Sequence, residues 1–351
     1  MPEILYRNRR AIRIENADIA VTVSVEGGHI AELIDKKSGI NPLWSPPWPS
    51  IEPSTYDPAR HPEYGANSES QLLAGILGHN LALDLFGSPS DEEFRAGLPV
   101  HGEVNVVEHS IESDSTSLRA RAHLPLAQLD FERDIRLEPG GVARIRETVT
   151  NLTAMDRPLA WTQHVTLGDP FIEPGVTRLN MTVGRSITYP VELSPHQPYK
   201  PWTEFQWPHA PHKDGSTIDL TTMPALARSA GVTGHLVEEH REQGWFLAWH
   251  PRMKVLTGYL WKRADFPWIS LWEENRSRDL PPWNGQTITR GVEFGVSPFA
   301  EARRSMIDRG SLFETSVYRW LPARAKVTAE YLAFVRLAET LPDQPPADIR
   351  L

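Results

Sequence analysis

The 351-residue sequence contains no cysteine. This absence excludes disulfide bonds, a thiolate nucleophile and a zinc site built on cysteine, and it fits the cytoplasm. No apolar run approaches the roughly 18 residues that span a bilayer. The N-terminal residues MPEILYRNRRAIRIE are charged and lack the apolar core of a secretory signal. We therefore expect a cytoplasmic protein with no membrane partner.

Basic residues are fewer than acidic ones. The chain has 36 Lys and Arg against 45 Asp and Glu, a net charge of −9. Nucleic acids and anionic lipids favour basic patches, so we expect no nucleic-acid partner. A glycine-rich phosphate loop, a G-x-S-x-G elbow and an H-E-x-x-H pair are missing too, which leaves nucleotide binding and triad hydrolysis unsupported.

Helical periodicity is limited to residues 93–98, a turn at 301–309 and an amphipathic stretch at 323–340. Period-two alternation dominates the rest, with glycine-rich turns such as those at 26–28 and 139–141. This pattern predicts an all-β protein, a large antiparallel β-sandwich with long loops and a C-terminal helix. We expect residues 1–310 to form the sandwich domain and residues 311–351 to form an extension whose helix packs on it.

What the sequence has in abundance is tryptophan, proline and glycine, with 12, 31 and 23 residues respectively. Proline and glycine fit many turns between short strands, and tryptophan supplies flat apolar walls for a core or for a ring-shaped ligand. Two irregular segments, 40–70 and 186–232, are unusually long. Loops of this length often build binding sites.

Polar residues interrupt several segments that otherwise have the pattern of buried strands. His101 lies in LPVHGEVN, His164 in AWTQHVTLG, and Glu273 and Glu274 in PWISLWEENRSR. Any one of them alone is more simply explained as a partly buried or surface residue with a structural role. Their occurrence in three distant strands of a Trp-rich β protein favours a shared site.

A metal site is one alternative. Two imidazoles and a carboxylate from His101, Glu103 and His164, with His79 as a further ligand, would suit a metal-dependent isomerase or lyase. The H-x-E spacing that carries this hypothesis is common by chance. The histidines at 196, 209 and 212 are better explained as surface loop residues.

Five stretches, taken in order, resemble the galactose mutarotase-like, or aldose 1-epimerase, superfamily. They are GGHIAELIDKKSGINPLW, GILGHNL, LPVHGEVN, ETVTNLTAMDRPLAWTQHVTLG, and ISLWEEN followed by ITRGVEFGVSPF. The resemblance spans about residues 20–300. It implies a supersandwich fold and an isomerase of carbohydrate metabolism that interconverts the anomers of a small-molecule sugar without a cofactor. A non-catalytic sugar-binding protein of the same fold is the alternative.

The resemblance also implies residue roles. His164 would be the acid that protonates the ring oxygen, a glutamate the base at the anomeric hydroxyl, and His101 a second imidazole near the sugar. We favour Glu274 over Glu273 as the base, because unbroken alternation places Glu274 on the same strand face as Trp272.

Sugar-binding candidates form a second group, in which His79 and Asn80 stand where the family has a sugar-binding Arg. The group comprises His79, Asn80, Trp44, Trp161, Trp272 and Lys262. The sequence shows no counterpart of the family's sugar-contacting Asp.

The segment 268–272 predicts which strand face meets the ligand. Trp268 and Trp272 alternate with Ile269 and Leu271. We expect the two aliphatic residues to enter the core and the two tryptophans to border the cleft.

Overall fold

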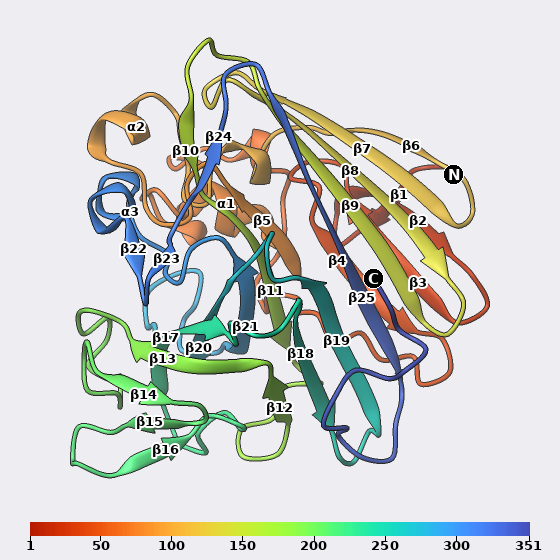
Figure 1. Ribbon diagram of the computed structural model, residues 1–351. Helices are drawn as coiled ribbons and strands as arrows, with labels where there is room; N and C mark the ends of the chain where they lie inside the picture. The colour runs from red at the N-terminus through yellow and green to blue at the C-terminus, as the bar shows by residue number, and fades with distance from the viewer.

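Two large antiparallel sheets face each other in the computed structural model, which describes residues 1–351 (Figure 1). The eleven-stranded sheet contains, in spatial order, β1 (Ile4–Tyr6), β2 (Arg9–Glu15), β3 (Ile19–Ser24), β4 (Ile30–Asp35), β5 (His79–Leu83), β11 (Trp161–Gly168), β21 (Ile288–Gly295), β20 (Trp268–Asn275), β17 (Ser229–Val237), β13 (Val183–Thr188) and β14 (Glu204–Gln206). The eight-stranded sheet contains β12 (Arg178–Met181), β18 (Gln243–His250), β19 (Val255–Lys262), β25 (Lys326–Leu337), β9 (Val142–Asn151), β8 (Leu129–Glu138), β7 (Ser117–Leu124) and β6 (Ser110–Ser113). The predicted β-sandwich is confirmed.

The remaining elements are short and lie outside the two main sheets. Three two-stranded ladders pair β10 (Arg157–Leu159) with β24 (Arg319–Leu321), β15 (His209–Pro211) with β16 (Thr217–Asp219), and β22 (Ser311–Leu312) with β23 (Thr315–Ser316). The helices are α1 (Ser70–Gly75), α2 (Asp91–Arg95) and α3 (Arg303–Arg309), and the 3₁₀ turns are η1 (Pro53–Thr55), η2 (Pro62–Tyr64) and η3 (Glu103–Asn105). The two shorter helical signals of the sequence correspond to α2 and α3. No helix combines the length and the hydropathy needed to cross a bilayer.

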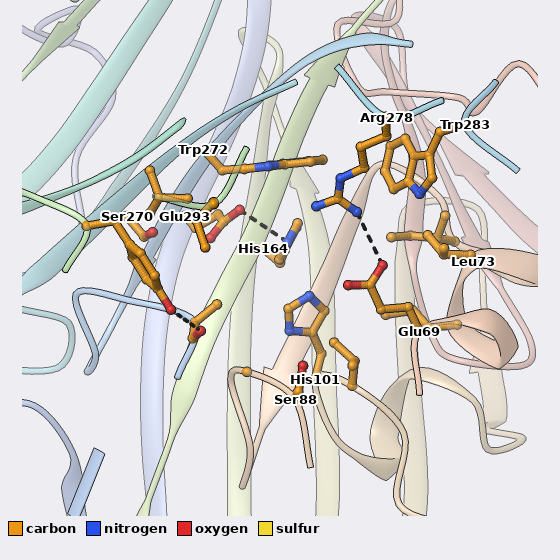
Figure 2. A pocket seen from close by; sticks show the side chains of 18 residues that line it. Glu69, Leu73, Ser88, His101, His164, Ser270, Trp272, Arg278, Trp283 and Glu293 are labelled. Carbon is orange, nitrogen blue, oxygen red and sulfur yellow. Dashed lines mark hydrogen bonds and ion pairs between the residues drawn. The ribbon is translucent and has the colours of Figure 1, made fainter. Parts of the chain in front are cut away.

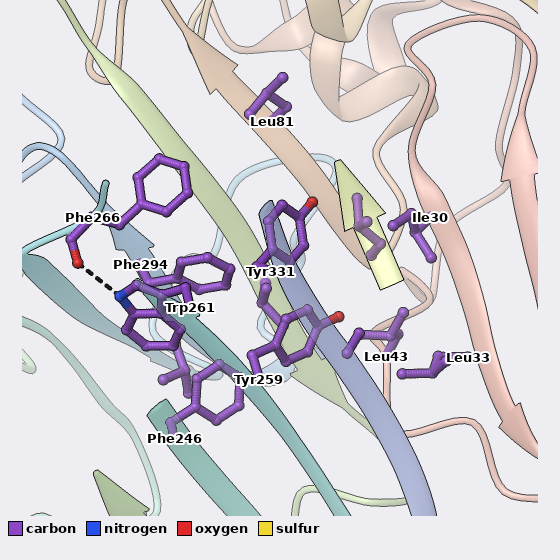
Figure 3. Close-up of a cluster of buried hydrophobic side chains, with 14 of the residues drawn as sticks. Ile30, Leu33, Leu43, Leu81, Phe246, Tyr259, Trp261, Phe266, Phe294 and Tyr331 are labelled. Atoms are coloured by element: carbon purple, nitrogen blue, oxygen red, sulfur yellow. Dashed lines mark hydrogen bonds between the residues drawn. The ribbon is translucent and has the colours of Figure 1, made fainter. Parts of the chain in front are cut away.

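Alternation of side chains separates the core from solvent in the eight-stranded sheet. In β8, Leu129, Phe131 and Ile135 point into the sandwich, and Asp130, Glu132 and Asp134 alternate with them on the solvent side. Facing residues of the two sheets interlock, as in the stack of Trp261 on Phe294 with ring centroids 4.1 Å apart (Figure 3). Such pairs join the sheets through both burial and ring geometry.

The central strands of the eleven-stranded sheet are buried on both faces. Every residue of β11 is buried, and so is every residue of β17. One face of this part of the sheet meets the main core, and loops and short helices cover the other face (Figure 1). A covered second face allows polar residues of these strands to line an enclosed site instead of meeting solvent.

A buried ion pair lies in the middle of the sandwich. Arg133 on β8 donates to Glu147 on β9 at 2.8 Å, and both side chains are almost wholly buried. Glu147 also accepts hydrogen bonds from Trp161, from Gln163 of β11 at 2.6 Å, and from Tyr331 of β25. These hydrogen bonds satisfy the carboxylate. A buried ion pair destabilises the fold unless its charged groups are hydrogen-bonded in this way.

The predicted C-terminal helix is wrong. Residues 326–337 form β25, which lies between β19 and β9 inside the eight-stranded sheet. Tyr331 and Val335 face the main core, whereas Leu332 and Phe334 are buried in a second cluster on the outer face. A strand buried on both faces loses its period-two pattern, which explains why the sequence resembled an amphipathic helix. The segment 311–351 is therefore part of the sandwich rather than an appended helix.

We expect Glu147→Leu to lower the free energy of unfolding by about 3–5 kcal/mol, because it leaves the Arg133 charge buried without its partner. The matched control is Glu330→Leu, which removes a partly exposed partner of Arg144 and should cost at most about 1 kcal/mol. Urea denaturation of both variants measures the difference. An equal loss of unfolding free energy in the two variants would show that the buried pair stabilises the fold no more than the exposed pair does.

Candidate active site

His164 and Glu293 face each other from neighbouring strands. β11 and β21 are antiparallel, with Gln163 opposite Phe294 and Thr166 opposite Gly291, so the same register sets His164 opposite Glu293. His164 Nε2 lies 3.1 Å from Glu293 Oε1, and both side chains are buried (Figure 2). An imidazole and a carboxyl group in this geometry share a hydrogen bond and can exchange a proton.

Burial shifts both groups toward their neutral forms. It raises the pKa of Glu293 to about 8, opposed by the Ser270 hydroxyl. Burial, and then the neighbouring His101, lower the pKa of His164 well below its usual range. A buried acid–base pair of this kind titrates as a unit. At neutral pH it holds a single exchangeable proton.

His101 stands next to His164 but comes from a turn. Its φ is 64°, and the Gly102 that follows is also left-handed, at 85°. The His101 Nδ1–H donates to the carbonyl of Phe86 at 2.6 Å, and the two imidazole centroids are 4.7 Å apart. Burial lowers the pKa of His101 to about 4, so its ring is neutral and Nε2 keeps a free lone pair. The expectation that His101 lies in a strand is wrong.

The other nitrogen of His164 is held within the sheet. Nδ1 lies 3.0 Å from the Thr166 hydroxyl and 3.5 Å from Asn80 Nδ2. Asn80 is on β5, directly opposite His164 in the ladder. These contacts fix the ring orientation and leave Nε2 for Glu293.

A cavity of about 270 Å³ opens over this pair. Trp272 of β20 and Trp283 of the following loop form aromatic walls, and Arg278 lies between them (Figure 2). The cavity is lined by Glu69, Leu72, Leu73, Ile76, Gly87, Ser88, Val100, His101, His164, Tyr189, Leu193, Val232, Ser270, Trp272, Arg278, Trp283, Glu293 and Ala300. The two long irregular segments contribute Glu69 from one and Tyr189, Leu193 and Val232 from the other. An apolar cavity with a few convergent polar groups is the usual form of a small-molecule site.

Several solved structures share the fold of this chain. A proposed aldose 1-epimerase from Klebsiella pneumoniae aligns with 95% of this chain and 80% of its own, at a TM-score of 0.64 and 16% identity. A galactose mutarotase-like protein from Lactobacillus casei aligns over 93% and 100%, at a TM-score of 0.58 and 12% identity. A proposed aldose 1-epimerase from Escherichia coli K12 aligns over 93% and 99%, at 0.59 and 13%. No family model matches the sequence, and no curated protein matches it.

The chain has the galactose mutarotase-like fold. The fold that the sequence motifs implied is therefore confirmed, and at identities this low the comparison concerns the fold alone.

The predicted alternation along β20 is present, but neither of its glutamates lines the cavity. Its pairing with β17 and β21 is continuous, without a bulge. Glu274 lies on the face of Trp272, where its carboxylate accepts from the backbone and hydroxyl of Ser277 at 2.5 and 2.6 Å. Glu273 points to the opposite face and pairs with Arg290 at 2.9 Å. The carboxyl group beside His164 belongs to Glu293, which the sequence argument missed.

The sequence did contain a signal for Glu293. In ITRGVEFGVSP it is the only acidic residue, and it lies among apolar and small residues within the buried strand β21. That is the same signal that singled out His164.

The remaining predicted binding residues are divided. Trp272 lines the cavity, and Asn80 reaches it only through His164. The other four do not line the cavity. His79 is hydrogen-bonded to Gln163 and Tyr259 in the core, and Trp161 is also a core residue. Trp44 stacks on Trp283, and Lys262 is exposed at the end of β19.

The two tryptophans of β20 also differ. Ile269 and Leu271 enter the main core, as predicted. Trp272 borders the cavity. Trp268 does not, because it is fully buried in a separate cluster and its indole N–H donates to the carbonyl of Ser316.

The residues of the metal hypothesis are dispersed. Glu103 accepts from the backbone of Leu126 and Ala127, and His79 is bonded within the core. No group of three His, Asp or Glu residues has the geometry to hold a metal ion. The H-x-E motif lies in a turn and a 3₁₀ helix, so its two side chains do not share a strand face.

Gly291 is required for the placement of Glu293. A Cβ at Gly291 would lie 2.4 Å from Glu293 Oε1 and 3.2 Å from a ring carbon of Trp272. We expect Gly291→Ala to break the Glu293–His164 contact while the sandwich stays folded. A crystal structure of the variant, with its melting temperature, measures both. The control is Gly184→Ala on β13, where the nearest atom would be 3.9 Å away. An unchanged contact in Gly291→Ala would contradict this reading.

Proposed function

We propose that the protein is an aldose 1-epimerase-type isomerase of carbohydrate metabolism, with Glu293 as the base and His164 as the acid. The observation that carries the proposal is the buried His164–Glu293 pair at the floor of a cavity with tryptophan walls. Sugar rings present C–H faces that stack on such walls. The galactose mutarotase-like fold supports the same substrate class.

The reaction needs one proton removed and one proton supplied. The Glu293 carboxylate takes the proton from the anomeric hydroxyl as the bond between C1 and the ring oxygen breaks, and the protonated His164 gives its proton to the ring oxygen. The open-chain aldehyde turns about its C1–C2 bond. The ring then closes with the two proton transfers reversed, and no cofactor takes part.

Direct contact between the two groups restores the reactive state. After ring opening Glu293 carries a proton and His164 is neutral, which is the form that burial favours in the free protein. In the free protein, transfer of the Glu293 proton across the 3.1 Å contact converts this neutral form into the carboxylate and the imidazolium that ring opening needs, and ring closure uses the neutral form that ring opening leaves. Either form of the pair therefore serves one direction of the reaction.

His101 completes the site as an acceptor. Its Nδ1–H is committed to Phe86, so Nε2 can accept a hydrogen bond from a sugar hydroxyl near His164. This arrangement makes His101 a binding residue rather than a second acid.

We expect Glu293→Gln and His164→Asn each to slow anomer exchange by about two to four orders of magnitude, the usual contribution of a positioned acid or base. Sugar affinity should change far less. Exchange NMR measures the rate, and quenching of Trp fluorescence measures binding.

The comparison variant is Glu274→Gln. Its loss of anomer-exchange rate should be at least about ten-fold smaller than that of Glu293→Gln, because Glu274 does not line the cavity. A larger loss in Glu274→Gln than in Glu293→Gln would move the base to Glu274. Sugar binding without any rate enhancement in the unmutated protein would favour the non-catalytic alternative.

The shared proton predicts the pH profile. The pKa of Glu293 is raised to about 8, so above that pH the pair loses its only proton and no acid remains. We expect kcat/KM to be flat near neutral pH and to fall about ten-fold per unit above pH ~8. The uncatalysed rate is subtracted at each pH. A rate constant that still rises at pH 9 would show that the pair does not act in its singly protonated form.

A further inference from the structure

We propose that Glu69 and Glu274 hold Arg278 as a neutralised hydrogen-bond donor, so that the cavity selects uncharged sugars and rejects sugars bearing a carboxylate or phosphate. The turnover part of this proposal rests on the proposed function, whereas the binding part does not. No sequence motif pointed to Arg278 or Glu69.

Arg278 is held from several sides at the cavity. Its Nη1 donates to Glu69 at 3.2 Å, and its Nε lies 3.6 Å from Glu274. Its guanidinium carbon is 4.5 Å from the ring centroid of Trp283 and 5.8 Å from that of Trp272. Figure 2 shows the guanidinium between these rings and directed at Glu69. An arginine fixed by carboxylates and aromatic faces is pre-organised for a planar hydrogen-bonding contact.

One edge of this guanidinium remains free. The contacts to Glu69 and Glu274 use Nη1 and Nε, and Nη2 makes no hydrogen bond within the protein. Since Arg278 lines the cavity, Nη2 is available as a donor to a bound ligand. A sugar hydroxyl is a suitable acceptor for it.

The charges around the cavity decide what that ligand can be. Arg278 is the only Arg or Lys that lines it. His101 is neutral, and the His164–Glu293 pair with its single proton carries no net charge. Glu69 balances Arg278, which leaves no net positive charge for an anionic substituent.

Glu274 adds a second negative charge close to Arg278. Its buried carboxylate lies near Arg278 Nε but outside the cavity. A phosphate or carboxylate placed against Arg278 would meet two carboxylates within the same neighbourhood. Like charges in a partly desolvated site repel strongly enough to discriminate between ligands.

The test compares neutral sugars with matched anionic ones. D-Galactose and D-glucose are paired with D-galacturonate, D-glucuronate and D-glucose 6-phosphate. Calorimetry measures binding, and exchange NMR measures turnover. We expect the unmutated protein to bind the neutral member of each pair at least about ten-fold more tightly.

Glu69→Gln should change this preference, because it removes one negative charge and frees Arg278. We expect the affinity for anionic sugars, relative to neutral ones, to rise about three- to ten-fold. Glu69 is partly exposed, so the variant should fold, and its melting temperature checks this. Glu132→Gln is the matched control, since it removes a carboxylate from an arginine pair on β8, far from the cavity lining.

The double variant Glu69→Gln/Arg278→Gln separates two explanations. If the raised affinity for anionic sugars disappears in the double variant, the anion binds to the released Arg278. A gain that persists without Arg278, or equal binding of neutral and anionic sugars by the unmutated protein, overturns the proposal. Selective binding without any anomer exchange would instead refute the proposed function and leave this inference standing.

Discussion

The buried pair of Arg133 and Glu147 is the constraint on which the rest of the structure depends. Two desolvated charges are tolerated only if their remaining hydrogen-bonding positions are filled, and the partners come from both sheets. Gln163 is one of them, and it donates to Glu147 and accepts from Tyr331. Because neighbouring residues of a strand point to opposite faces, fixing Gln163 in the core places His164 on the other face. A slip of one residue in β11 would bury His164 between the sheets and remove it from the cavity.

From that face the geometry of the site follows by strand pairing. The register of β11 with β21 sets Glu293 opposite His164, and the register of β21 with β20 sets Ser270 opposite Glu293. Gly291, two residues before Glu293, leaves room for the carboxylate to lie over the strand. Three strands thus position His164, Glu293 and Ser270. The loop that follows β20 adds Trp283 and Arg278 to the cavity lining, opposite the wall that Trp272 of β20 forms.

Local pattern was enough for the sandwich and for His164, because alternation and a polar residue in an apolar strand are both visible in a few residues. It was not enough where burial is decided by distant segments. β25 is covered on its outer face by residues such as Trp245 and Ile349, and this second burial erased the pattern of a strand. Glu293 became a partner of His164 only because β21 pairs with β11, a neighbour far away in the sequence. The turn residue Trp283 carried no periodic signal at all, since its role comes from the path of the chain after β20.

Gln163 and His164 are neighbouring polar residues of one strand, and their side chains point to opposite faces of the sheet. On the core face, both oxygens of the Glu147 carboxylate accept hydrogen bonds. On the face that carries the cavity, Asn80 Oδ1 is buried and has no hydrogen-bond partner, whereas the Ser270 hydroxyl interacts with the Glu293 carboxyl group. An atom such as Asn80 Oδ1 costs ~1–3 kcal/mol while it stays unpaired. A bound ligand that supplies the missing partner recovers that cost. Ser270 lines the cavity beside Glu293, so its hydroxyl is placed to contact a polar group of a ligand bound there.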